Sequence, residues 1–404
     1  MDQPKKLKIC FIGWSDSIHV QRWVQWFAER GHEVHLLSNS DCQVAGVTVH
    51  SLAGKRRGGG PAEPAKGTGK TGPIKELLAK LKFYYLSYLR YPLYIYRARK
   101  IIRELRPDIL QAFYIGFGGY VGIFTGFHPF MICTGGADIM FFPRKFMLHR
   151  LMTRYVLKRA DFIVHPSEES NQLAIKLGAP AERTAYQHFG VDLALFNPKV
   201  DPGPLLDRLG LRGRPVILST RGLYDQYYNI SGLLKAFALV VSAVPTARLI
   251  LKYYSAPEIN KFEDLAKTLG IYDKIIWVGK SEYESMGQYY RCAEVYVSLS
   301  YTDSGSLSML EAMACGTTPV VSDLPNIREW IKPGWNGYLL KPDDVQGAAA
   351  AIIKVISDRA ERTLYGERNV KLIEERADQN KCYRNLEKIA YGLVVLGAAG
   401  NKGR

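Results

Sequence analysis

The sequence has few cysteines, and none of them is spaced as a zinc ligand. Neither a CxxC nor a CxH pattern occurs, and a chain of this length has little need of a disulfide framework. Isolated cysteines are usually small buried side chains in a reducing compartment. We therefore expect no metal site and a cytoplasmic location. The six stand singly among the 404 residues: Cys10, Cys42, Cys133, Cys292, Cys315 and Cys382.

Long hydrophobic runs are also scarce. The opening residues MDQPKKLKICFIGW contain no signal-peptide core, because their apolar run is short and continues into a strand-like segment. Residues 109–132 lack Asp, Glu, Lys and Arg and are long enough to span a membrane, but they contain several glycines and Pro129. We expect them to divide into a strand (108–113), a glycine-rich helix (117–125) and a second strand (130–133).

Acidic residues are few where basic residues are densest. The chain has 54 Lys and Arg against 38 Asp and Glu, a formal net charge of +16. Residues 54–103 hold 13 basic residues against Glu63 and Glu76, and residues 144–159 hold six with no acid. The positive charge therefore belongs to the first 160 residues. It predicts an anionic partner: nucleic acid, a membrane surface or a phosphorylated substrate.

Two segments of the basic region differ in composition. Residues 55–72 are rich in Gly, Pro and Lys, and we expect a mobile surface insertion. Residues 74–105 predict a helix, interrupted near Pro92, with tyrosines beside its basic residues. This pattern fits an interfacial helix on anionic lipid and equally a domain helix with its aromatic side in the core; nucleic acid is less favoured. The candidate membrane-docking residues are Lys75, Lys80, Lys82, Tyr84, Tyr85, Arg97 and Arg99.

Strand and helix patterns alternate along both halves of the chain. Residues 7–12 and 33–37 predict strands that flank a loop and an amphipathic helix, the opening unit of a doubly wound sheet. The same alternation restarts at residue 216. The sequence therefore predicts an α/β protein with two Rossmann-like doubly wound domains facing a cleft. The expected parts are a first domain at 1–189, a linker at 190–214, a second domain at 215–372 and a C-terminal helix at 373–404 that crosses back to the first domain.

The most informative segment is 301–316, YTDSGSLSMLEAMACG. A strand is expected to end near residue 299, and a small polar loop leads into a helix that starts near Ser306. Free N–H groups at a helix start bind anions, and a diphosphate suits such a site. Asp303 and Glu311 flank the loop, and their carboxylates could accept hydrogen bonds from sugar or ribose hydroxyls.

This segment resembles the acidic signature of the retaining GT-B glycosyltransferases of family 4. The family signature is Glu, seven residues, Glu, then Ala-Met-Ala-Cys-Gly-x-x-Pro-Val-Val; here Asp303 and Glu311 are followed by AMACGTTPVV. The resemblance continues in Cys-Ala-Glu-Val-Tyr-Val-Ser before it and Gly-Trp-Asn-Gly-Tyr-Leu-Leu after it. It covers nearly the whole chain except the insertion at 55–72.

The resemblance implies transfer of a sugar from a UDP- or GDP-sugar to a glycan or lipid-linked acceptor, with retained anomeric configuration. It implies no cofactor and no obligate metal, because cationic side chains and helix dipoles neutralise the diphosphate. The first domain would bind the acceptor and the second the nucleotide sugar. With the basic first domain, this predicts polysaccharide or glycolipid synthesis by a cytoplasmic protein peripheral to the inner face of the cell membrane.

The resemblance also assigns site residues. The catalytic candidates are Asp138, Arg221, Asp303 and His19. The donor-binding candidates are Gly13, Arg221, Lys252, Val278, Lys280, Asp303, Ser304, Gly305, Ser306, Leu307 and Glu311.

Two departures from the family pattern keep other functions open. Tyr228 stands where the family has a Lys, with Lys252 as a candidate substitute, and Asp303 replaces a Glu. The alternatives are a membrane- or nucleic-acid-binding module that has lost catalysis, and a GT-B epimerase or phosphorylase.

Overall fold

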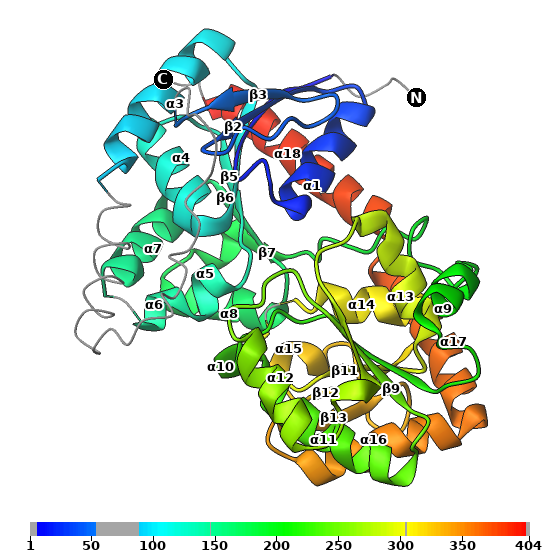
Figure 1. Ribbon diagram of the computed structural model, residues 1–404. Coiled ribbons are helices and arrows are strands. Elements are labelled where there is room, and N and C mark those ends of the chain that lie inside the picture. The colour runs from blue at the N-terminus through cyan, green and yellow to red at the C-terminus, as the bar shows by residue number, and fades with distance from the viewer. Residues whose placement is uncertain (1–5, 54–88, 146, 304, 401–404) are drawn as a thin grey trace. The chain divides into compact units, whose positions relative to one another are not determined.

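The computed structural model describes residues 6–53, 89–145, 147–303 and 305–400 (Figure 1). The chain forms two compact units, Met1–His188 with Tyr383–Arg404, and Phe189–Cys382. Among the helices in these residues, none combines the length and the apolar composition that a membrane span requires. The insertion expected at 55–72 lies outside the described residues, as do the candidate docking residues Lys75, Lys80, Lys82, Tyr84 and Tyr85.

The first unit is built on a sheet of seven strands. They are β1 (Lys8–Ile12), β2 (Glu33–Ser38), β3 (Thr48–Ser51), β4 (Ile109–Phe113), β5 (Phe130–Cys133), β6 (Phe162–His165) and β7 (Thr184–Tyr186). All pairs are parallel, in the order β3-β2-β1-β4-β5-β6-β7. Every residue of β4 is buried, as expected for a central strand covered by helices on both faces.

Helices cover both faces of this sheet. They are α1 (Ile18–Glu29), α3 (Tyr91–Leu105), the π-helical η1 (Tyr114–Gly119), α4 (Tyr120–Thr125), α5 (Ala137–Met140), α6 (Phe142–Lys145), α7 (Met147–Arg159), α8 (Glu168–Leu177) and the 3₁₀ turn η2 (Ala181–Arg183). In Figure 1, α3, α4 and α7 lie on one side of the strands and α1 on the other. Ile102 of α3, Val121 of α4 and Val156 of α7 join one buried core.

The second unit contains six parallel strands. They are β8 (Val216–Ser219), β9 (Arg248–Lys252), β10 (Ile275–Val278), β11 (Val295–Ser298), β12 (Thr318–Ser322) and β13 (Tyr338–Leu340). Their order is β10-β9-β8-β11-β12-β13. Leu218 of the central β8 lies beside Ile250 of β9 and Tyr296 of β11. This sheet is therefore also doubly wound, as the sequence predicts.

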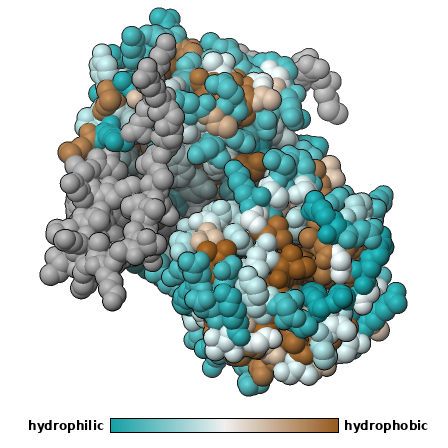
Figure 2. Space-filling model, viewed as in Figure 1, coloured by the Kyte–Doolittle hydropathy of each residue, from teal (hydrophilic) through white to brown (hydrophobic). Residues whose placement is uncertain are grey.

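Two separate cores hold the helices of the second unit. The helices and turns are α9 (Gly203–Leu209), α10 (Asp225–Tyr228), α11 (Ile230–Ala243), α12 (Ile259–Thr268), η3 (Tyr272–Lys274), η4 (Tyr283–Ser285), α13 (Met286–Cys292), α14 (Leu307–Ala314), α15 (Pro325–Arg328), α16 (Val345–Ser357) and α17 (Arg359–Arg376). Phe237 of α11 and Ile352 of α16 belong to one core, and Met309 of α14 and Ile373 of α17 to the other. On the face of this unit that Figure 2 shows, exposed apolar residues are surrounded by hydrophilic ones.

Residues 190–214 belong to the second unit, where the sequence suggested a linker. Phe196, Leu205 and Leu211 are buried in its core, and the Val191 N–H donates to the Ala377 carbonyl at 2.7 Å. The Pro and Gly residues therefore mark turns around α9, and the apolar residues between them anchor the segment.

The last helix, α18 (Gln379–Gly400), begins in the second unit and runs back into the first. The Tyr383 and Trp23 rings stack with centroids 6.0 Å apart. The Glu387 carboxylate accepts a hydrogen bond from Arg30 Nε at 3.0 Å, and its Oε1 lies 2.9 Å from His32 Nε2. The chain therefore belongs to the first unit again from Tyr383 onward.

Candidate functional site

Four strands bring charged side chains to one edge of the second sheet. Arg221 follows β8, Lys252 ends β9, Lys280 follows β10 and Asp303 follows β11. Because these strands are adjacent and parallel, the loops at their carboxyl ends lie at the same edge. The second unit therefore gathers donor-binding candidates that are up to 82 residues apart in the chain.

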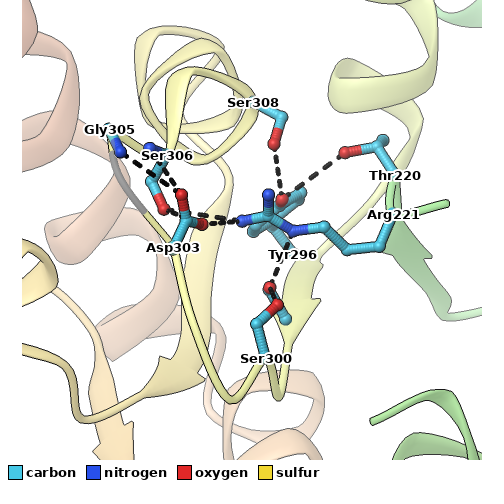
Figure 3. Close-up of polar contacts among 9 residues, drawn as sticks. Thr220, Arg221, Tyr296, Ser300, Asp303, Gly305, Ser306 and Ser308 are labelled. Atoms are coloured by element: carbon cyan, nitrogen blue, oxygen red, sulfur yellow. Dashed lines mark hydrogen bonds and ion pairs between the residues drawn. The ribbon is translucent and has the colours of Figure 1, made fainter. Parts of the chain in front are cut away.

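Arg221 is held between several partners (Figure 3). Its Nε donates to Ser298 Oγ at 2.8 Å, and its Nη2 forms an ion pair with Asp303 Oδ2. Nη2 also lies 3.4 Å from Ser306 Oγ, and the guanidinium lies 5.7 Å from the Tyr228 ring centroid. The Arg221 and Asp303 side chains are only 13% and 9% exposed. The aromatic residue at the family's Lys position thus packs near the arginine and adds no second cation.

The ion pair keeps both groups charged. Burial disfavours the charged guanidinium, but the Asp303 carboxylate outweighs burial and raises the pKa of Arg221. Burial also opposes ionisation of Asp303, yet the Arg221 charge and hydrogen bonds from Ser306 and Gly305 hold its pKa below the ordinary value. The positive charge that would attract a diphosphate is therefore already balanced by a carboxylate.

Asp303 also covers the start of α14. Its Oδ1 accepts the N–H of Ser306 at 3.0 Å and of Gly305 at 3.3 Å, and its Oδ2 accepts the Ser306 hydroxyl at 2.5 Å. Ser306 has a left-handed backbone with φ 41°, and the helix begins at Leu307. The N–H groups of residues 305 and 306, which the sequence suggested were free for an anion, therefore already bind this carboxylate. Ser304 lies outside the described residues.

Glu311 lies on the buried side of α14 with different partners. Its carboxylate accepts hydrogen bonds from the Tyr283 hydroxyl at 2.6 Å and the Tyr290 hydroxyl at 2.9 Å. The two carboxylates expected to flank one loop thus interact with different groups. Neither tyrosine was predicted as a site residue: Tyr283 lies in η4 and Tyr290 in α13. A spacing of seven in an apolar stretch is the signal that could have placed both on one face.

The remaining candidates of the second unit lie along the same edge. Lys252 Nζ donates to the Gly279 carbonyl, and burial lowers the pKa of this lysine. Val278 ends β10 and is half-buried, whereas Lys280 is exposed. The Lys252 side chain is therefore held by the loop that follows the neighbouring strand β10.

Gly13 and His19 lie in the first unit. Gly13 follows β1, and a Cβ there would lie 3.3 Å from the side chains of Val20 and Phe113. The position is thus too tight for a larger residue without a shift of its neighbours. His19 is exposed in the first turn of α1.

Asp138 is a buried carboxylate in the same unit. Its Oδ2 accepts the Ile115 N–H at 2.8 Å, and its Oδ1 accepts the N–H of Gly136 at 2.8 Å and of Gly135 at 3.1 Å. Burial raises the pKa of Asp138, although these hydrogen bonds oppose the shift. Asp138 therefore joins the loop after β5 to the start of η1.

Tyr114 was not predicted as a site residue. It follows β4 with φ 63°, a left-handed backbone that is uncommon for a bulky residue and is enriched at functional sites. A Cβ on Gly135 would lie 1.7 Å from the Tyr114 ring, and the Trp14 ring centroid is 5.3 Å away. The glycine-rich sequence after the strand is the signal that could have drawn attention to it.

No metal-binding cluster is found in the part of the chain that the structure describes. Groups of three or more His, Cys, Asp or Glu side chains suited to a metal are absent there. The six cysteines form no disulfide with one another; Cys42 is exposed and the others are buried.

Both units match family models. Residues 8–167 match the model described as glycosyl transferase 4-like, and residues 207–372 match glycosyl transferases group 1. The D-inositol 3-phosphate glycosyltransferase of Geodermatophilus obscurus is 32% identical over 213 residues, which are 50% of this chain and 47% of that protein. The chain thus spans about half the length of the first curated relatives it matches.

Solved structures have a similar fold over nearly the whole chain. Sucrose-phosphate synthase from Thermosynechococcus elongatus has a TM-score of 0.77 and 17% identity, covering 96% of this chain and 99% of that one. Anabaena HepE in complex with UDP-glucose has a TM-score of 0.73 and 17% identity, covering 96% and 100%. With the two doubly wound sheets, these likenesses define a protein of the GT-B fold. The two family matches place the chain among the group 1 glycosyltransferases.

Proposed function

We propose that the protein is a retaining glycosyltransferase that moves a sugar from a UDP- or GDP-sugar to a glycan or lipid-linked acceptor. The second unit binds the nucleotide diphosphate at the carboxyl edge of its sheet, and the first unit binds the acceptor. The two family models support this division, since the group 1 model covers the unit that carries Arg221. Synthesis of a cell-surface polysaccharide or glycolipid fits these substrates.

The observation that carries the proposal is Arg221, which follows β8 and whose side chain is only 13% exposed. A guanidinium matches phosphate oxygens in a bidentate geometry, and the start of α14 lies beside it. Negative charge develops on the diphosphate as its bond to the sugar breaks, and a preorganised cation stabilises that charge. We propose that Arg221 supplies this charge without a metal ion.

The reaction needs no enzyme nucleophile in this proposal. The bond between the sugar C1 and the diphosphate oxygen breaks, and the acceptor oxygen bonds to C1 on the same face. The acceptor proton passes to the leaving phosphate oxygen. The engagement of Asp138 with three backbone N–H groups and of Glu311 with two tyrosines favours this route over a covalent intermediate.

A donor and acceptor panel tests the proposal. The protein is incubated with UDP- and GDP-sugars, with and without glycan and lipid acceptors, and products are identified by mass spectrometry and NMR. We expect acceptor-dependent transfer with retained configuration, unchanged by EDTA. Sugar conversion without an acceptor would instead indicate an epimerase, and phosphate-dependent release of a sugar phosphate a phosphorylase. Vesicle or nucleic-acid binding with no reaction would indicate a binding module.

We also propose that the first unit docks on the anionic inner face of the cell membrane, near a lipid-linked acceptor. On α7, Met147, Leu151 and Tyr155 are 71%, 58% and 36% exposed and lie on one helix face at spacings of four. Arg150 and Lys158 are also exposed on this helix, so apolar and cationic groups combine as on an interfacial helix.

The α3 helix adds a second exposed apolar group on the same side of the sheet (Figure 1). Leu93 and Tyr96 are 45% and 68% exposed. Of the docking candidates in α3, Arg99 is exposed, whereas Arg97 donates to the Leu52 carbonyl at 2.7 Å. Arg99 is therefore suited to a lipid headgroup, and Arg97 has a structural partner.

A further inference from the structure

Asp303 makes several contacts that a diphosphate would also need. Its two oxygens receive the Arg221 guanidinium, two backbone N–H groups at the start of α14 and the Ser306 hydroxyl (Figure 3). Guanidinium groups, helix-start N–H groups and hydroxyls are the usual donors to bound phosphate. A carboxylate and a phosphate cannot occupy the same donors together, because their like charges repel.

The orientation of Arg221 does not depend on Asp303 alone. Its Nε is held by Ser298 Oγ at 2.8 Å, and Ser298 Oγ is in turn 2.9 Å from Ser300 Oγ. The Tyr228 ring packs near the guanidinium. If the carboxylate moved away, these partners would keep the Nη2 edge directed at the start of α14.

A buried arginine needs a negative partner in the protein without substrate. An unpaired charge with this little exposure is strongly destabilising, and Asp303 removes that penalty. The left-handed turn at Ser306 is fixed by the same carboxylate through its bonds to the Ser306 N–H and hydroxyl. Asp303 thus stabilises the loop in a conformation that covers the phosphate donors.

We propose that Asp303 is an internal competitor for the donor diphosphate: it occupies Arg221 and the start of α14 until a nucleoside diphosphate displaces it. This inference rests on the proposed function, because it assumes that the diphosphate binds at Arg221. It adds that Asp303 weakens donor binding and sets the donor concentration at which the site fills. A carboxylate that only positioned the bound sugar would have no such effect on the nucleotide alone.

Calorimetric titration with UDP and GDP tests the proposal on the full chain. Asp303→Asn keeps the size of the side chain but removes its charge, and Asp303→Ala is the second variant. Both should bind the preferred nucleoside diphosphate about tenfold or more tightly than the wild type, because a charge-assisted competitor is lost. Affinity for the free nucleoside, uridine or guanosine, should not change.

Two controls separate competition from a general gain of positive charge. Asp207→Asn removes an exposed carboxylate that pairs with Arg212 in the same unit, and it should leave affinity unchanged. In an Arg221→Ala background, Asp303→Asn should give no gain. Thermal melting of each variant establishes that it is folded.

The outcomes distinguish a failure of the competitor role of Asp303 from a failure of the proposed donor site. If the wild type binds UDP or GDP and folded Asp303 variants bind it equally or more weakly, the competitor role is wrong and the proposed function stands. If neither the wild type nor the folded variants bind either nucleotide, the proposed donor site itself is wrong.

Discussion

Three charged side chains of the second unit are each balanced by a different kind of partner. Arg221 pairs with a carboxylate, Glu311 accepts from two phenols, and Lys252 donates to a backbone carbonyl. Buried charges require such partners, since an ion left unpaired in a dry interior is costly. These contacts explain why the side chains hold fixed positions in the structure.

Glu311→Gln tests how much the tyrosine contacts stabilise the second unit. The amide weakens two charge-assisted hydrogen bonds and presents an N–H₂ group to a phenol, so we expect a loss of about 2 kcal/mol in the free energy of unfolding. Denaturant titration measures this loss. Glu375→Gln, at an exposed acid on α17, is the matched control and should change stability by less than about 0.5 kcal/mol. Equal stability of the two variants would show that the Glu311 contacts contribute little.

At the scale of elements, apolar periodicity predicts the central strands and the helices between them. The alternation expected to restart at residue 216 begins there with β8, the strand expected to end near residue 299 is β11, and the helix expected to start near Ser306 begins at Leu307. The edge strands β3 and β13 were missed, because they are short and their residues are only half-buried or exposed. Apolar runs are strongest where helices cover both faces of a strand.

The details of the site could not be read from the same patterns. The motif identified Asp303 and Glu311, but their partners depend on which way each side chain turns. Asp303 turns back onto residues 305 and 306, and Glu311 turns into the α13–α14 contact. Such choices depend on tertiary packing and on buried charge, which leave no periodic signal in the sequence.

The attachment of α18 to the first unit predicts a pH dependence. Burial opposes ionisation of Glu387, but hydrogen bonds from Arg30 and His32 outweigh it and lower its pKa. A carboxylate with a lowered folded-state pKa stabilises the fold above its unfolded pKa, about 4.3, and this contribution is lost as the pH falls through the folded value.

Glu387→Gln should therefore reduce stability by about 2 kcal/mol at pH 7 and abolish this part of the acid dependence. Melting temperatures of the wild type and the variant, measured from pH 7 to pH 3, should differ most at neutral pH and converge as the pH falls through the folded-state pKa of Glu387. A constant difference across that range would contradict the role assigned to the ionised carboxylate.

At the scale of the whole molecule, the positive charge and the predicted chemistry belong to different units. The basic segments lie in the first unit, whereas Arg221 and Asp303 lie in the second. This separation suits a protein that meets an anionic surface with one unit and a nucleotide sugar with the other.

Co-sedimentation with vesicles tests the docking surface. Leu151→Asp places a charge in the exposed stripe of α7 and should weaken binding to phosphatidylglycerol-containing vesicles about tenfold or more. Leu364→Asp, at a leucine 43% exposed on α17 of the second unit, is the control and should bind like the wild type. Equal binding by both variants would place the contact elsewhere.

The most direct test of the donor site is the rate of nucleoside diphosphate release by Arg221→Ala. If Arg221 stabilises the leaving diphosphate, kcat/KM should fall about 100- to 1,000-fold. Arg212→Ala, at an exposed arginine of the same unit that also pairs with an aspartate, should keep the wild-type value. The Arg221→Ala, Asp303→Asn double variant leaves no unpaired carboxylate. Its kcat/KM should stay as low as that of Arg221→Ala, because the cation is still missing. Wild-type kcat/KM in the folded double variant would contradict the assignment of the diphosphate to Arg221.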